Sequence, residues 1–204
     1  MNQTASVPNH HADYPGFSGL SGLVAALSMI KRGEADARLA ARLSRIGPGD
    51  ALLDIGCGPG GAARHAARLG ASVTGVDPAP VMLRVARLLT RRSRNVRYVE
   101  GAAESMPAAD DSASIVWSIA AVHHWADIDA GLGEALRVLR PGGRLIAIER
   151  HTEPGAHGLA SHGWTESQAE AFAARCREYE FVDVRVERNL SRPRSTVSVI
   201  ATAP

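Results

Sequence analysis

The stretch Leu52-Leu53-Asp54-Ile55-Gly56-Cys57-Gly58-Pro59-Gly60-Gly61 joins a hydrophobic run to a turn rich in glycine. The run is typical of a buried β-strand, and the glycines predict a tight turn that opens a helix. Because glycine lacks a side chain, the backbone of such a turn can approach a ligand closely. The sequence therefore predicts a strand, a ligand-binding turn and a helix, in this order.

Outward from this stretch, short runs rich in β-forming residues alternate with helical stretches. This alternation is typical of a parallel sheet with helices on both faces, whereas two runs near the end of the chain favour a closing antiparallel pair. We expect an α/β fold with a doubly wound, mostly parallel, seven-stranded sheet. The predicted strands are 51–55, 72–77, 96–100, 114–119, 144–149, 181–188 and 196–203, and the predicted helices are 61–69, 80–92, 128–138 and 166–177.

The length of the chain, 204 residues of which 45% are hydrophobic, allows one substantial core. We expect a single domain, with a helical N-terminal cap at 1–46, a ligand-binding core at 50–150, and a C-terminal helix with closing strands at 151–204. We expect neither a signal peptide nor a membrane span. The cysteines, Cys57 and Cys176, lack metal-ligand spacing, which favours a reducing compartment such as the cytoplasm.

The formal net charge is only +2, and arginines supply nearly all of the positive charge. They are scattered along the chain, and the dense run at 91–97 falls at the end of a predicted helix, where cations complement the helix dipole. This distribution argues against a nucleic-acid partner. We expect a monomer or homodimer that binds neither nucleic acid nor a membrane and that acts on a small molecule.

A second carboxylate follows the next predicted strand, at Asp77. The carboxyl ends of neighbouring parallel strands share one edge of a sheet, so Asp54, the glycine turn and Asp77 are expected to line one crevice. An aspartate about 20 residues beyond the glycines suits a ribose, because its oxygens can accept from both hydroxyls. The pattern predicts a cofactor that contains a nucleoside.

Two classes of cofactor compete for this crevice. Gly56, Gly58 and Gly61 also satisfy the spacing of a dinucleotide fingerprint, which would indicate a nicotinamide-dependent oxidoreductase. A pyrophosphate, however, needs free N–H groups and no nearby anion, whereas this turn holds Pro59 and follows Asp54. The sulfonium and ammonium groups of S-adenosylmethionine match the charges better, and a module that binds this cofactor without catalysis is a further alternative.

Four motifs of this sequence resemble the ordered motifs of class I S-adenosylmethionine-dependent methyltransferases. They span roughly residues 50 to 150. A fifth stretch, residues 118–125, is similar to the corresponding stretch of the subgroup related to quinone-biosynthesis C-methyltransferases. The four motifs are Asp54-Ile55-Gly56-Cys57-Gly58-Pro59-Gly60, Val76-Asp77, Gly101-Ala102-Ala103-Glu104 and Leu139-Arg140-Pro141-Gly142-Gly143-Arg144-Leu145.

The resemblance implies a methyl transfer from S-adenosylmethionine to a small-molecule acceptor. It implies that the glycines make room for the cofactor, that Asp77 binds the ribose and that the backbone near Ala103 faces the adenine. Many relatives carry an aspartate where this chain has Ala102, so the contact to the adenine amino group is either lost or supplied by a neighbour. The predicted cofactor-binding residues are Asp54, Gly56, Cys57, Gly58, Asp77, Pro78, Ala103, Glu104 and Ser118.

Histidines are the candidates for acid–base chemistry. His123 and His124 lie in the segment that the resemblance places beside the sulfonium, where either can accept a proton from a substrate hydroxyl or amine; structural roles in capping or packing are the alternative. Positioning alone can also supply most of the rate of methyl transfer. His151, His157 and His162 fall in a glycine-rich stretch without cysteine, which favours loop histidines and no metal.

Overall fold

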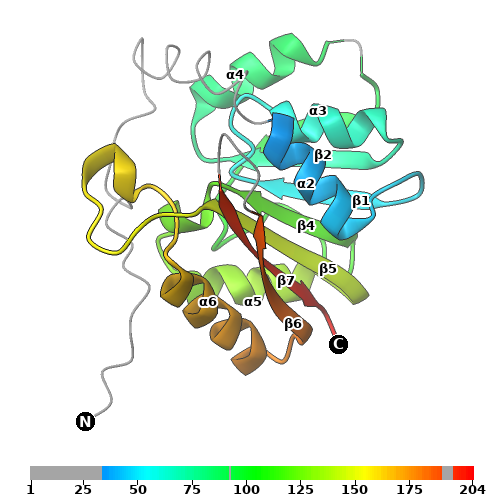
Figure 1. Ribbon diagram of the computed structural model, residues 1–204. Helices are drawn as coiled ribbons and strands as arrows, with labels where there is room; N and C mark the ends of the chain where they lie inside the picture. Colours follow the sequence, from blue (N-terminus) through cyan, green and yellow to red (C-terminus); the bar gives the residue numbers. More distant parts are fainter. Residues whose placement is uncertain (1–33, 92, 190–194) are drawn as a thin grey trace.

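A seven-stranded sheet forms the centre of the computed structural model, which describes residues 34–91, 93–189 and 195–204 (Figure 1). Its strands are β1 (Ala51–Ile55), β2 (Ser72–Asp77), β3 (Val96–Glu100), β4 (Ala113–Ile119), β5 (Leu139–Arg150), β6 (Val182–Asn189) and β7 (Thr196–Thr202). They lie in the order β3-β2-β1-β4-β5-β7-β6. The first five strands are parallel, and β7 runs antiparallel to both β5 and β6, which confirms the predicted fold class.

Helices cover both faces of this sheet. They are α2 (Glu34–Ser44), α3 (Gly61–Arg68), α4 (Pro80–Leu89), α5 (Ile128–Val138) and α6 (Glu166–Glu178), with short 3-10 helices η1 (Val122–His124) and η2 (Gly158–Ser161). Figure 1 shows α2 and α3 on one side of the sheet and α5 and α6 on the other. The part of the predicted N-terminal cap before residue 34 lies outside the described residues.

Alternating side chains of the central strands supply two cores. Leu52 and Trp117 face α2, α3 and α4, whereas Leu53 and Val116 face α5 and α6. All four side chains are almost fully buried. Since successive residues of a strand point to opposite faces, continuous hydrophobic runs such as those of β1 and β4 are what a sheet covered on both sides requires.

From residue 51 onward, the predicted element boundaries hold to within one residue except at two places. β5 begins at Leu139 and not at residue 144, because Leu139 pairs with Ala113 of β4 before a shift in register. α4 ends at Leu89 and not at residue 92. The backbone N–H of Thr90, the residue after the helix, donates to the carbonyl oxygen of Arg87 at 3.2 Å and closes the last turn.

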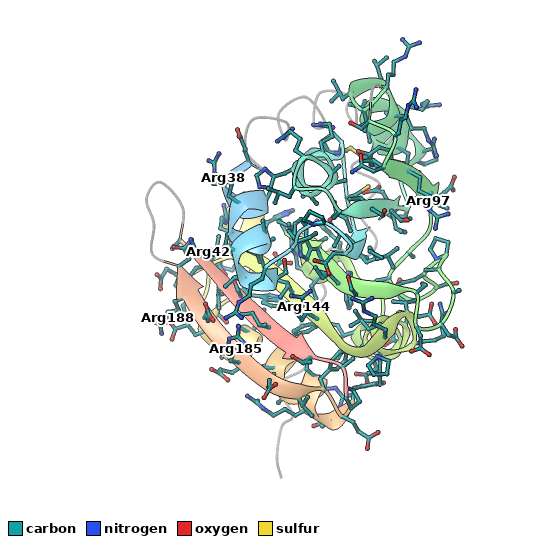
Figure 2. The ribbon with its side chains drawn as sticks, turned by 90° about the vertical axis from the view of Figure 1, so that its right-hand side faces the viewer. Arg38, Arg42, Arg97, Arg144, Arg185 and Arg188 are labelled. Atoms are coloured by element: carbon teal, nitrogen blue, oxygen red, sulfur yellow. The ribbon has the colours of Figure 1, made fainter. Side chains whose placement is uncertain are left out.

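Arginine side chains are distributed over several elements. Figure 2 labels arginines of α2, β3, β5 and β6, and in this view Arg97 of β3 lies apart from the others. Arg38 pairs with Glu34, and Arg144 pairs with Asp50 at 3.2 Å. Within the part of the chain that the structure describes, every helix is too short or too polar to cross a lipid bilayer.

Candidate functional site

The glycine turn is fastened to the end of β2. The backbone N–H groups of Gly56 and Cys57 both donate to the carbonyl oxygen of Val76, at 2.8 and 3.0 Å. The N–H of Gly58 donates to Oδ2 of Asp77 at 2.8 Å. The turn and the second acidic residue therefore form one hydrogen-bonded unit at the carboxyl edge of the sheet.

These bonds leave the turn without amides for an anion. The N–H of Gly60 donates to the carbonyl oxygen of Cys57 at 2.9 Å, and Pro59 has no N–H. Each backbone donor in residues 56–60 is thus already used within the protein. A pyrophosphate, which needs several free N–H groups, does not suit this turn.

Two positions of this turn require glycine, because other segments of the protein pack closely against the backbone there. Gly56 has a φ of +69°, and a Cβ built on it would lie 2.5 Å from Cβ of Ala121. Gly60 has a φ of +74°, and a Cβ there would collide with the ring of Tyr98. Any side chain at either position would push the turn away from the segments beneath it.

Asp54 is buried directly before the turn, at 1% exposure. Its Oδ2 has no hydrogen-bond partner among the described residues. Burial, and secondly the charge of Asp77, raise the pKa of Asp54 from 3.8 to about 7, and a hydrogen bond from the backbone of Ala63 opposes this shift. A buried carboxylate with an unused oxygen is suited to receive a cation.

Asp77 ends β2 with both oxygens engaged. Oδ1 accepts from the N–H of Ala79 at 2.9 Å, and Oδ2 accepts from Gly58 at 2.8 Å. Burial raises the pKa of Asp77, and these two hydrogen bonds oppose the shift. Since each carboxylate oxygen can accept more than one hydrogen bond, Asp77 retains acceptor capacity for further hydroxyl groups.

The other residues predicted to bind the cofactor lie at the same edge with different local roles. Ser118 is fully buried and pairs with Ile55, and its hydroxyl has no partner among the described residues. Ala103 is buried, and Glu104 accepts from the N–H of Asp127 at 3.1 Å, which connects it to the start of α5. Pro78, next to Asp77, is exposed.

Cys57 fills space within the turn. Its side chain is 7% exposed, and burial together with the charges of Asp54 and Asp77 raises the pKa of the thiol well above its usual value. A thiol held in its neutral form is a poor nucleophile. The structure thus supports the interpretation of Cys57 as a small residue in a tight site.

His123 and His124 lie in η1, directly after β4. At Ala120 the chain turns with a φ of 53°, and the N–H of this residue donates to Ile148 of β5 at 2.7 Å. This turn carries η1 over the end of β5. There, Oε2 of the fully buried Glu149 lies 2.8 Å from Nδ1 of His123.

The structure also groups histidines that the sequence analysis considered separately. The ring centroid of His162 lies 5.6 Å from that of His123 and 5.9 Å from that of His124. His151 instead lies 3.8 Å from a carboxylate oxygen of α6, and His157 is exposed. The three loop histidines therefore do not act as a unit.

Comparisons with known proteins agree with this geometry. Residues 53–147 match the family model described as a methyltransferase domain. This stretch is just under half of the chain, and over it the chain resembles class I S-adenosylmethionine-dependent methyltransferases. The cofactor of this class, S-adenosylmethionine, is the one that the sequence favoured, and the resemblance to enzymes of quinone biosynthesis is confirmed.

The curated relatives are matched over only part of their length. The demethylmenaquinone methyltransferase of Tropheryma whipplei (strain Twist) is 36% identical over 114 residues, which are 55% of this chain and 46% of that protein. The malonyl-[acyl-carrier protein] O-methyltransferase of Serratia marcescens is 34% identical over 146 residues, 72% of this chain and 55% of that one. The chain thus spans about half the length of these curated relatives.

The fold of the domain is also that of solved methyltransferases. A S-adenosylmethionine-dependent methyltransferase from Aquifex aeolicus superposes with a TM-score of 0.68 and 18% identity, covering 87% of this chain and 98% of that one. The residues at this edge fit that cofactor, because the unpartnered Oδ2 of Asp54 can face a positive charge and Asp77 retains acceptor capacity for ribose hydroxyls.

Proposed function

We propose that this protein transfers a methyl group from S-adenosylmethionine to a small-molecule acceptor. The observation that carries the proposal is a buried carboxylate oxygen of Asp54, unpartnered among the described residues, beside a turn whose amides are already used. This combination selects a positively charged nucleoside over a phosphorylated one. The geometry therefore favours a sulfonium cofactor over a nicotinamide dinucleotide.

We assign roles to the residues of the carboxyl edge on this basis. Asp54 holds the ammonium end of the cofactor, directly or through water. Asp77 receives the ribose hydroxyls with the acceptor capacity that its two backbone hydrogen bonds leave. The backbone near the buried Ala103 faces the adenine. The cofactor itself supplies the activated methyl group, so orientation of the acceptor and exclusion of water are the main tasks of the chain.

His123 is the candidate proton acceptor for a hydroxyl or amine substrate. Its contact with Glu149 at 2.8 Å fixes the ring and favours a proton on Nδ1, which leaves the lone pair on Nε2. Its neighbour His124 is less buried and lies within 4.0 Å of it, centroid to centroid. Replacing Glu149 by Gln is expected to reduce kcat more than it raises KM if His123 takes a proton.

The residues that select the methyl acceptor are proposed to lie outside the cofactor-binding core at 50–150. Relatives named for demethylmenaquinone and for malonyl-[acyl-carrier protein] match 55% and 72% of this chain, so the two matches overlap. A region shared by enzymes with different acceptors carries the cofactor and not the specificity. We also propose that the protein acts in the cytoplasm, where its two buried cysteines stay reduced.

Calorimetric titration tests the proposed cofactor. S-adenosylhomocysteine is expected to bind the full chain with a dissociation constant of about 1 μM, a free energy of roughly −8 kcal/mol, whereas NADH is expected to show no saturable heat. Binding of NADH in place of S-adenosylhomocysteine would overturn the proposal. Transfer of a labelled methyl group to any member of a quinol, phenol and acyl-thioester panel separates an enzyme from a module that only binds the cofactor.

A further inference from the structure

Three imidazoles from two separate segments meet at the carboxyl edge of the sheet. One nitrogen from each of His123, His124 and His162 lies within 4.8 Å of the other two. The ring centroids of His123 and His124 are 4.0 Å apart. We propose that these histidines form a binding site for a divalent transition-metal ion, with Zn²⁺ as the probe of choice.

The ligand chemistry points to this class of ion. Neutral imidazole nitrogens bind zinc and its neighbours in the first transition row, whereas Mg²⁺ and Ca²⁺ require oxygen ligands. Three imidazoles provide three of the four positions of a tetrahedral zinc site, and a fourth position stays open to water or substrate. Binding of an ion would require the three nitrogens to move closer together than the 4.8 Å within which they now lie.

Glu149 supplies the outer shell of this site. Its carboxylate is 1% exposed, and Oε2 lies 2.8 Å from Nδ1 of His123, while Oε1 accepts from the backbone N–H of His123 at 3.4 Å. A carboxylate that accepts from one ring nitrogen fixes the tautomer and raises the basicity of the other. The arrangement gives a reason for burying a carboxylate at the end of β5.

The position of His162 is fixed by its neighbours in the chain. Gly163 has a φ of +139°, and a Cβ there would collide with the carbonyl group of Arg150. The N–H of Trp164 donates to the same carbonyl at 2.9 Å, and the Trp164 ring packs on Phe172 of α6 at 4.9 Å. The loop after β5 is thus folded back onto the strand end, which delivers His162 to the η1 histidines.

The proposed metal site adjoins the cofactor turn. Ala121, the residue before η1, would be touched by a side chain at Gly56, so η1 packs directly against the glycine turn. An ion with an open position there can bind an oxygen of the acceptor and lower the pKa of its hydroxyl. Binding of the acceptor by the ion rests on the proposed methyl transfer. The existence of the metal site does not depend on that function. A metal-bound His123 cannot also accept a proton, so its role as proton acceptor applies only to the protein without the ion.

Zinc titration of the full chain tests the site. Tag-free protein stripped with EDTA is expected to bind one Zn²⁺ per chain by calorimetry, and Co²⁺ is expected to give the intense visible absorption of four-coordinate cobalt. His162→Ala should weaken Zn²⁺ binding by more than the roughly 10–100-fold that outer-shell changes cause, and Glu149→Gln should fall within that range. His157→Ala is the matched control, because this exposed histidine of the same loop lies outside the cluster.

Two results would overturn the metal site. One is the lack of saturable Zn²⁺ binding by the wild-type chain, and the other is equal affinity in the His162→Ala and His157→Ala variants. A joint His10→Ala and His11→Ala variant is expected to keep full affinity, and loss of binding there would assign the zinc to the N-terminal segment instead. S-adenosylhomocysteine binding by the stripped protein, measured in parallel, shows that each variant is folded and tests the proposed function separately.

Discussion

Asp54 places a titratable group where water cannot reach it. Its pKa of about 7 in the folded chain compares with 3.8 for an exposed aspartate. Between these values the folded state holds a proton that the unfolded state has released, so the free energy of unfolding falls as pH rises through this window. The ionised carboxylate therefore lowers the stability of the cofactor-free chain, which is consistent with the proposed role of Asp54 in cofactor binding.

We expect the Asp54→Asn variant without cofactor to be more stable than the wild type at pH 8, by on the order of 2–4 kcal/mol. The difference should shrink toward pH 4, close to the unfolded-state pKa of 3.8, because the wild-type carboxyl is then protonated in the folded state and partly protonated in the unfolded state. Urea unfolding at a series of pH values measures it. A constant difference between the two proteins across this range would contradict the raised pKa.

Cofactor affinity should show the opposite trend. The ionised Asp54 attracts the ammonium and sulfonium groups, so S-adenosylmethionine should bind the wild type more tightly as pH rises from 6 to 8, with the change centred at about 7. Asp54→Asn should bind more weakly at pH 8 and lose this pH dependence. An unaltered profile in the variant would remove Asp54 from the cofactor site.

Asp77 joins the turn and the proposed ribose in one residue. Asp77→Asn replaces an oxygen acceptor by an amide donor that faces the N–H of Gly58 or Ala79. We expect cofactor affinity to fall by about 1–3 kcal/mol. Asp110→Asn, an exposed aspartate paired with Arg137, is the control and should bind as the wild type does. Equal affinities in both variants would tell against the assignment of Asp77.

Local signals predicted most of the elements. The switch from hydrophobic runs to glycine turns and apolar helical stretches fixed β1, β2, α3 and α5 closely, because their boundaries depend on nearby residues. The helix α4 ends at Leu89 and not at residue 92, and the hydroxyl of Thr90, the next residue, contacts the hydroxyl of Tyr98 in β3 at 2.9 Å. Such contacts between elements leave no periodic signal in a single sequence.

Some residues of the candidate site could be predicted from the sequence and others could not. Asp54 and Asp77 could be predicted because the carboxyl ends of neighbouring strands must meet. The same rule applied to β5 would have found Glu149, which the sequence analysis did not single out. The approach of His162 to η1 could not be predicted, because it depends on the path of a loop of irregular structure between β5 and α6.

The helix α6 begins with a reciprocal cap that supports the loop carrying His162. Thr165 accepts from the N–H of Gln168, and the Gln168 side chain accepts from the N–H of Thr165 at 2.8 Å. We expect Thr165→Ala to lower the free energy of unfolding by about 1 kcal/mol. Chemical denaturation measures the change. Ser161→Ala is the matched control, because it removes a hydroxyl whose hydrogen bond to the carbonyl oxygen of Gly158 is exposed to solvent. A variant as stable as the wild type would show that the cap contributes nothing.

At the scale of the molecule, one sheet joins two cores. We predict a single cooperative unfolding transition, as expected for one domain. Leu83→Ala and Leu132→Ala truncate fully buried side chains on opposite faces of the sheet. Each substitution should lower the free energy of unfolding by about 2–5 kcal/mol. Tryptophan fluorescence and far-UV circular dichroism should report the same midpoint in each variant. Separate midpoints for the two probes would indicate two independently folding units.

The hydrogen bonds within the glycine turn affect how abundant adenine nucleotides of a cell would compete for the cofactor crevice. ATP shares the adenosine moiety with S-adenosylmethionine and would present the same ring and sugar to the crevice. Its triphosphate, however, would meet amides already committed to Val76 and Asp77 and the negative charge of Asp54. We therefore expect the backbone of the glycine turn to discriminate against ATP even where ATP is in large excess over S-adenosylmethionine.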